Sequence, residues 1–351
     1  MTDVETPRLS ADQGEYFRVR PTGRSEAITI AFADGNVPAG SYPAALVQGC
    51  PGSNIQLNSP PGQAYQLGVP GHRESFDDLV NWVRGLADER GRGAITLVGQ
   101  GVGGRAALLI GGLVNGVNVL AISPELTLGL HGGHSNKVTL HPWWGSLQDV
   151  ARVGRGRRRC ISLYSPWNPL DAHFLSLPVA HEPSLGVALE MKAAGDPVAR
   201  LKENGCYADL LAQDADLQAV LRDSTIALTP FSIGARAQYE HFHNAFEAYS
   251  GRAKSLPQAL DLAAEHSQWA NPGWQNLRSN IYRLAEMPEQ ALAASDMALA
   301  IDDSSQEYCV GHARNIVQFS IAKRVPDAVE KLKPFLAKKG VPDLQKALLS
   351  I

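Results

Sequence analysis

The sequence lacks the features that mark membrane, nucleic-acid-binding and disulfide-rich proteins. Hydrophobic residues make up 44% of its 351 residues, yet no run of them approaches the ~20 that a membrane helix needs. The formal net charge is −3, which implies no overall attraction to nucleic acid or to an anionic membrane. Residues 1–16 are polar and carry acidic side chains early, unlike a secretory signal peptide. We therefore expect a cytoplasmic protein without a membrane span or a nucleic-acid partner.

Residues that bind metals or form disulfides are also scarce. The four cysteines lie far apart, at Cys50, Cys160, Cys206 and Cys309. They show neither disulfide nor metal-ligand spacing, and we expect free, buried thiols in a reducing compartment. The segment that carries His131, His134 and His141 holds no cysteine or acid to complete a ligand set. The sequence therefore predicts no metal site and no cofactor.

The first half of the chain alternates between strand-like and helix-like segments. Strand-like runs lie at 26–32, 44–48, 55–57, 95–98, 117–122 and 160–164. Residues 75–84 have apolar side chains at helical spacing with Ser75 as the expected N-cap, and a second helix is expected at 105–113. This alternation predicts an α/β fold, a mainly parallel sheet with helices on both faces. The run 95–98 is apolar without alternation, so we expect a central parallel strand there.

The second half changes character after residues 197–204. Strand signals thin out, and alanine-rich amphipathic segments follow. Three of these segments open with a proline after an apolar residue, at Leu256-Pro257, Met287-Pro288 and Val325-Pro326. Proline suits the first turn of a helix, and its recurrence predicts stacked helical hairpins. We expect one domain at 15–204 and an all-α domain at 205–351.

The middle hairpin resembles a tetratricopeptide repeat. Ser279 and Tyr282 occupy the small and aromatic positions of its first helix, and Ala291 and Ala298 occupy the small positions of its second. The resemblance implies that Tyr282, Ala291 and Ala298 share one interface and that these helices can bind a protein partner. A helical subdomain packed on the sheet is the alternative.

A glycine turn joins the strand at 95–98 to the following helix. In a hydrolase the turn would read Gly-x-Ser-x-Gly, with the nucleophilic serine at its tip. Here Gly101 occupies that tip, so the usual nucleophilic oxygen is missing. Gly99, Gly101 and Gly104 also match the dinucleotide-binding pattern G-x-G-x-x-G, with Glu125 after the next strand as the expected ribose ligand.

Four segments resemble, in order, a group of bacterial α/β-hydrolase-like proteins associated with surface polysaccharide or accessory secretion systems. They are residues 65–71, 75–84, 96–108 and 120–128. In that group the elbow reads approximately Gly-Asn-Ser-x-Gly-Gly, so Gln100 takes the asparagine place and Gly101 the serine place. The resemblance implies a degenerate elbow and a setting in envelope-polysaccharide assembly.

The remaining members of a vestigial triad would follow in the order acid, then histidine. Asp171 follows the strand at 160–164, and His181 precedes a helix-like run at 185–194. His173 is the competing histidine, and a cap residue with a surface histidine is the alternative to any triad.

The elbow also predicts a ligand-binding site. The Val102 amide and an amide from residues 34–37 would form an anion hole, and the ligand would contact Gly99, Gln100, Gly101 and Val102. Three functions stay open. The leading one is a pseudoenzyme with a binding or scaffolding role. The others are an active esterase or acyltransferase with an unconventional site, and a dinucleotide-binding protein.

Overall fold

The computed structural model describes most of the chain. The described residues are 11–21, 27–35, 37–50, 52–91, 93–130, 132–133, 135–137, 159–181, 186–193, 195–212, 219–220, 222, 228–250 and 255–323. The chain forms two compact units, one of residues 1–165 and 174–233 and the other of residues 166–173 and 234–351. The boundary predicted after residue 204 falls within the first unit, between two of its helices.

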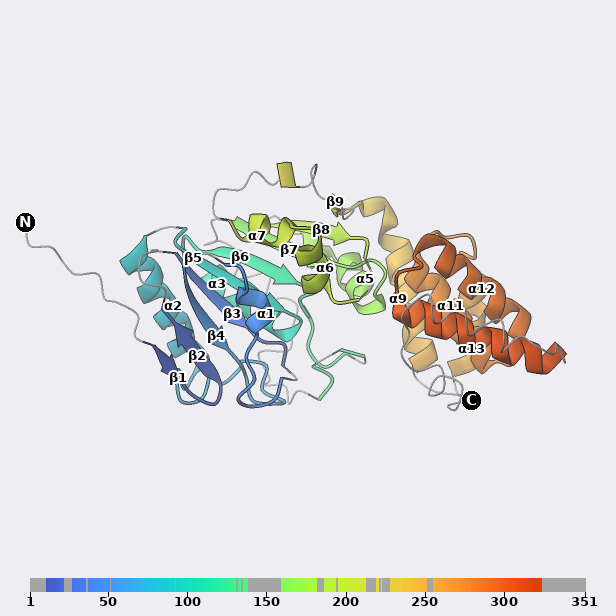
Figure 1. Ribbon diagram of the computed structural model, residues 1–351, viewed down its shortest axis with the longest axis horizontal. Helices are drawn as coiled ribbons and strands as arrows, with labels where there is room; N and C mark the ends of the chain where they lie inside the picture. Colours follow the sequence, from blue (N-terminus) through green and yellow to red (C-terminus); the bar gives the residue numbers. More distant parts are fainter. Residues whose placement is uncertain are drawn as a thin grey trace, which may run out of the picture. The chain divides into compact units, whose positions relative to one another are not determined.

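The first unit contains a mostly parallel sheet (Figure 1). Its strands are β1 (Asp12–Gln13), β2 (Phe17–Arg20), β3 (Ile28–Phe32), β4 (Ser53–Leu57), β5 (Ile95–Gln100), β6 (Asn118–Ile122), β7 (Arg159–Tyr164), β8 (Val187–Met191) and β9 (Leu228–Pro230). They lie side by side in the order β1-β2-β4-β3-β5-β6-β7-β8-β9. The strands from β4 to β8 in this order are parallel, while β1, β2 and β9 are antiparallel to their neighbours.

Strand β5 lies in the middle of the sheet, between β3 and β6 and parallel to both, which confirms the prediction for residues 95–98. The first five residues of β5 are buried, as are all residues of β3 and β6. A central parallel strand is covered on both faces, so an apolar run without alternation suits it.

Helices cover both faces of this sheet. On one face, α1 (Ala44–Val47), α6 (Pro197–Glu203) and α7 (Cys206–Leu211) join a core with side chains of β3, β5, β6, β7 and β8. The helices α2 (Phe76–Arg90) and α3 (Val102–Leu113) pack together and against β5. The α/β class and the two-sided covering predicted from the alternation are confirmed. Within the described ranges, no helix has both the length and the apolar composition that crossing a membrane would require.

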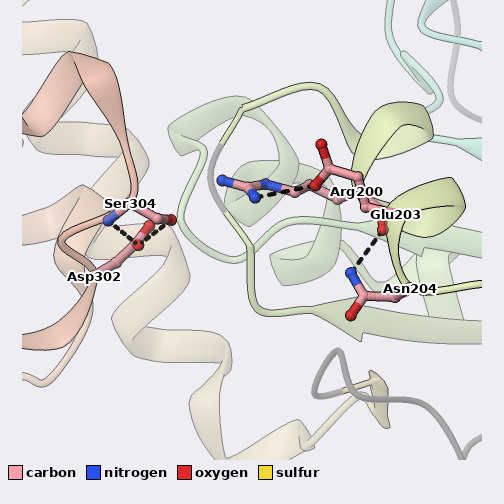
Figure 2. Close-up of polar contacts among 5 residues, drawn as sticks. All are labelled: Arg200, Glu203, Asn204, Asp302 and Ser304. Carbon is pink, nitrogen blue, oxygen red and sulfur yellow. Dashed lines mark hydrogen bonds and ion pairs between the residues drawn. The ribbon is translucent and has the colours of Figure 1, made fainter. Parts of the chain in front are cut away.

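Side-chain caps explain where several of these helices begin and end. Ser75 is the N-cap of α2, as predicted, and its Oγ accepts a hydrogen bond from Asp78 N at 3.1 Å. At the end of α6, Asn204 Nδ2 donates to Arg200 O at 2.8 Å, and Arg200 pairs with Glu203 at 3.2 Å (Figure 2). These contacts are local, so the sequence alone can encode them.

Two short segments correct the predictions from sequence. Residues 44–48 were expected as a strand but form helix α1, and the run 185–194 was expected as a helix but contains strand β8. Short apolar runs do not distinguish the two structures by periodicity. Strand pairing determines the structure of the second segment, because β8 lies between β7 and β9 in the sheet. Strands β1, β2 and β9 were not expected from the sequence.

The second unit is helical throughout its described residues. It contains α9 (Arg236–Ser250), α10 (Leu256–Ala264), α11 (Pro272–Leu284), α12 (Pro288–Ile301) and α13 (Gln306–Lys323), and the first five residues of α5 (Pro169–Ser176). Pro257 and Pro288 open helices as predicted, whereas Val325-Pro326 lies outside the described residues. After α12, Asp302 Oδ1 accepts hydrogen bonds from Ser304 N at 3.0 Å and Ser304 Oγ at 2.6 Å (Figure 2).

Helices α11 and α12 form a hairpin that packs on α10 and α13. Tyr282, Ala291 and Ala298 are all buried, and the Tyr282 hydroxyl donates to Ala263 O of α10 at 3.1 Å. Asn315 of α13 donates to Ser279 Oγ at 2.6 Å and to Ala291 O at 3.2 Å. The expected helical hairpin is therefore present, and its similarity to a tetratricopeptide repeat stays a prediction.

Candidate functional site

The turn between β5 and α3 has the backbone geometry of a nucleophile elbow. Gly101 has φ 55° and ψ −121°, a conformation that L-residues rarely adopt and that glycine reaches freely. Its amide donates to Ile122 O at 3.0 Å, and its carbonyl accepts from Arg105 N and Glu125 N, each at 3.1 Å. A strained residue at a strand-to-helix turn is the arrangement that exposes the serine of a hydrolase. Here the arrangement is present and the serine is not.

The other glycines of the turn let α3 approach the sheet closely. A Cβ on Gly103 would lie 2.2 Å from Phe32 O, and a Cβ on Gly99 would lie 2.2 Å from Gly103 O. A Cβ on Gly104 would lie 3.1 Å from Gly99 O. Gly103 and Gly104 therefore occupy positions where a side chain would meet main-chain atoms. Helix–sheet packing thus accounts for these glycines without a bound nucleotide.

Asp34, in the loop after β3, covers the tip of the elbow. A Cβ built on Gly101 would lie 2.5 Å from Asp34 Oδ1 and 3.0 Å from Oδ2. The Val102 amide points at the same carboxylate, with 3.4 Å between Val102 N and Asp34 Oδ1, which is a long and weak hydrogen bond. A carboxylate oxygen of the protein itself therefore faces the amide expected to hold an oxyanion.

The loop that carries Asp34 is held in place by Tyr65. The Tyr65 hydroxyl lies 2.9 Å from Ala33 O and 3.1 Å from Leu57 O, and Ala33 N donates to Leu57 O at 2.9 Å. Burial and the nearby Asp34 charge raise the pKa of Tyr65, so the hydroxyl stays protonated and donates to these carbonyls. Val37 N donates to Asp34 O at 3.1 Å, so a second amide of the expected anion hole also has an acceptor within the protein.

Glu125 does not have the surroundings expected of a ribose ligand. Its carboxylate is buried and accepts hydrogen bonds from Ser135 N at 3.1 Å and from Ser135 Oγ. The Asp34 carboxylate also lies where a pyrophosphate would approach the N-terminus of α3, and two anions there would repel each other. Both observations weigh against the dinucleotide interpretation of the glycine turn.

Asp171 lies in the first turn of α5, in the second unit, whereas the elbow lies in the first. Asn168 Oδ1 accepts hydrogen bonds from Leu170 N at 2.9 Å and Asp171 N at 3.3 Å, so Asn168 rather than Asp171 caps this helix. Asp171 is buried there, and the start of a helix favours a negative charge. The start of α5 by itself therefore stabilises the Asp171 carboxylate.

His181 ends the short 3₁₀ helix η1 (Pro178–His181), in the connection from β7 to β8, and its side chain lies outside the described residues. The pairing of Asp171 with His181 stays a prediction. The competing His173 stacks on His243 of α9, with 3.9 Å between ring centroids. Burial lowers the pKa of both imidazoles, to about 4 for His243. Both rings are therefore neutral at pH 7.

Two further expectations concern histidines and cysteines. His131, His134 and His141 lie outside the described residues. All four cysteines are free, and three of them are buried while Cys50 is half-buried.

No family model and no curated protein matches the chain. Among solved structures it is similar to Thermogutta terrifontis esterase 2 phosphoramylated by tabun, with 13% identity, a TM-score of 0.35 and coverage of 56% of this chain and 85% of that one. It is also similar to a hyperthermophilic esterase from the archaeon Pyrobaculum calidifontis, with 11% identity, a TM-score of 0.37 and coverage of 65% and 80%. At these identities and TM-scores we draw no conclusion about activity from the esterases.

Proposed function

We propose that this protein is a pseudoenzyme, a hydrolase-like protein whose elbow no longer supports nucleophilic catalysis and which acts by binding or scaffolding. The position of Asp34 carries this proposal. Gly101 removes the nucleophile, and the Asp34 carboxylate stands 2.5 Å from where any Cβ at that position would be. A working hydrolase needs that space for its serine and the Val102 amide for the oxyanion.

The setting that we propose comes from the resemblance stated above. Proteins with a similar series of segments are associated with surface polysaccharide or accessory secretion systems, so we propose a bacterial, cytoplasmic role in envelope-polysaccharide assembly. The helices of the second unit, in a tetratricopeptide-like arrangement, are the proposed surface for a protein partner. The Ser279, Tyr282, Ala291 and Ala298 positions support that arrangement, because all four are buried among α10 to α13.

The test uses a fluorophosphonate probe, which labels activated serines, on the full-length protein. We expect no labelling of the native chain. Gly101→Ser alone should label less than a variant that also lacks the Asp34 carboxylate, because that carboxylate must move aside for the new side chain. The double variant Asp34→Ala/Gly101→Ser removes that obstacle. If Asp171 and His181 retain a relay, it should label more than either single variant, and adding His181→Ala should abolish the gain.

The matched control is Gly40→Ser. Gly40 also has a positive φ, of 76°, but a Cβ there would have no heavy atom within 4 Å. This variant should behave as the native chain does. Labelling of the native chain, mapped to any serine, would refute the pseudoenzyme proposal and favour the active esterase. An unlabelled double variant that is folded would refute the relay of Asp171 and His181 while leaving the pseudoenzyme in place.

A further inference from the structure

A cluster of metal-ligating side chains lies in the second unit, away from the elbow. His241 on α9 and Glu265 and His266, directly after α10, each offer one ligand atom, and these atoms all lie within 4.8 Å of one another. His241 Nδ1 is 3.7 Å from Glu265 Oε2. The two histidine rings meet edge to face, with 4.7 Å between their centroids. Two imidazole nitrogens and a carboxylate oxygen form a common zinc ligand set.

A hydrogen bond orients the half-buried His241 for metal binding. His241 Nε2 lies 2.9 Å from Leu262 O, and a carbonyl can only accept, so Nε2 carries the proton. In the neutral ring this leaves the Nδ1 lone pair directed toward Glu265. Metal-ligating histidines in proteins usually donate their second ring N–H to a carbonyl or carboxylate in this way. The Leu262 carbonyl therefore already holds the His241 ring in the orientation that metal binding requires.

The backbone that presents His266 is also fixed. The His266 carbonyl accepts hydrogen bonds from Trp269 N and Trp274 Nε1, both at 3.0 Å. His266 itself has φ 47°, in the left-handed region that few residues other than glycine adopt. Trp274 is fully buried, and its ring also packs against His241. One buried indole thus supports both histidines of the cluster.

We propose that His241, Glu265 and His266 bind one divalent transition-metal ion of the zinc class. Ligand atoms 2.0–2.2 Å from a tetrahedral ion lie about 3.3 Å apart, so the cluster must contract slightly on binding. Glu265 can supply this movement because its side chain is 63% exposed. The ion would tether α9 to the connection between α10 and α11. Three protein ligands leave the fourth position to water or to a donor group of a bound molecule.

The test measures zinc binding to the full-length protein by competition with a chromogenic chelator, and cobalt binding by visible absorption. We expect one ion per chain, tetrahedral cobalt bands and no thiolate charge-transfer band, because no cysteine belongs to the cluster. Binding should weaken as the pH falls, because protons compete with the metal ion for its ligands. Zinc should also raise the melting temperature.

Two variants remove ligands without disturbing the fold. Glu265→Gln keeps the size of an exposed side chain, and His266→Asn introduces a residue that tolerates positive φ. Each should weaken zinc binding by at least about 10-fold, the smallest loss expected even for an outer-shell partner. Their melting temperatures in a chelator should equal that of the parent.

The control removes the other histidine group of the sequence, as His131→Ala/His134→Ala/His141→Ala. It should retain the zinc affinity. Absence of stoichiometric binding, binding that survives His266→Asn and Glu265→Gln, loss of binding in the control variant, or a thiolate band with cobalt would each overturn the proposal.

Discussion

Helix α11 of the second unit and the central strands of the first unit differ in how many polar side chains they bury. In the first unit, the buried side chains of β3, β5 and β6 are mostly apolar, with Thr29, Thr96 and Asn118 as the polar exceptions, and glycines let a helix and a strand approach closely. In the second unit, helix α11 buries polar and charged side chains next to its tryptophan and isoleucine. The buried polar residues of this region are Asn271, Gln275, Asn276, Arg278 and Ser279.

The difference follows from how each region pairs its main-chain groups. Strands of the sheet pair with one another through the hydrogen bonds of the ladder, so few polar side chains are needed there. Carbonyls in the last turn of α10 and in the connection to α11 accept hydrogen bonds from side chains of α11. Arg278 donates to Ala263 O at 2.7 Å and to Ser267 O at 3.1 Å, and Gln275 donates to Ser267 O at 2.9 Å and Trp269 O at 2.8 Å. Side chains there supply the hydrogen bonds that neighbouring strands supply in the sheet.

The largest effect should come from adding a single methyl group in the first unit. Gly103→Ala places a Cβ 2.2 Å from Phe32 O, a backbone atom that cannot rotate away. We expect a loss of about 3 kcal/mol in the free energy of unfolding, at the upper end for overpacking. Hydrogen exchange read by mass spectrometry should locate the loss in peptides of the sheet.

The control for this variant is Gly85→Ala in α2, where a Cβ would have open space. That substitution should stabilise the helix by about 0.5–1 kcal/mol, because alanine is the better helix former. Equal effects of the two variants would contradict the close approach of α3 to β3.

The next largest effect should come from removing the buried hydrogen bonds of Arg278 on α11. Arg278→Met removes a charged donor from Ala263 O and from Ser267 O, which keep only the Tyr282 hydroxyl and Gln275 Nε2 as side-chain donors. We expect a loss of about 2–3 kcal/mol, measured by denaturant unfolding, with exchange increasing in the peptides of α10 and α11. Arg283→Met on the same helix loses a hydrogen bond to Asn280 and should cost less than 1 kcal/mol. A similar loss in both variants would refute the role assigned to Arg278.

A pH effect should come from a buried histidine of the second unit, His243. Burial, together with the neighbouring His173, lowers the pKa of His243 to about 4, below the ordinary value of ~6.5. Between pH 6.5 and 4 the unfolded chain binds the proton that the folded chain excludes, so stability falls as the pH falls through this window. His243→Phe keeps an aromatic ring and should reduce that fall by about 2 kcal/mol. An unchanged pH dependence of unfolding would contradict the buried, neutral imidazole.

The smallest effect should come from the support of Asp34. Tyr65→Phe removes the hydroxyl that donates to Ala33 O and Leu57 O. The expected loss is about 1 kcal/mol, the usual net contribution of one hydrogen bond. In the Gly101→Ser background it should also loosen the Asp34 loop and increase any probe labelling. A stable variant with no change in labelling would show that Tyr65 does not position Asp34.

Local signals in the sequence determined much of the first unit. The apolar run at 95–98 predicted the central strand, Ser75 predicted a helix start, and the spacing of Gly99, Gly101 and Gly104 predicted the turn. Pro257 and Pro288 likewise predicted where two helices of the second unit begin. These features depend on residues within one turn of each other, so neighbours in the chain suffice to specify them.

Only the tertiary structure decided what surrounds these elements. From the sequence, residues 34–37 were expected only to supply an amide, but the fold brings the Asp34 carboxylate to Val102, 68 residues away. It gave no sign that His241 would meet Glu265 and His266, since the contact requires α9 and α10 to pack together. Residues 187–191 form a strand because β7 and β9 offer partners. Each outcome depends on contacts between distant segments, which packing fixes and local periodicity does not record.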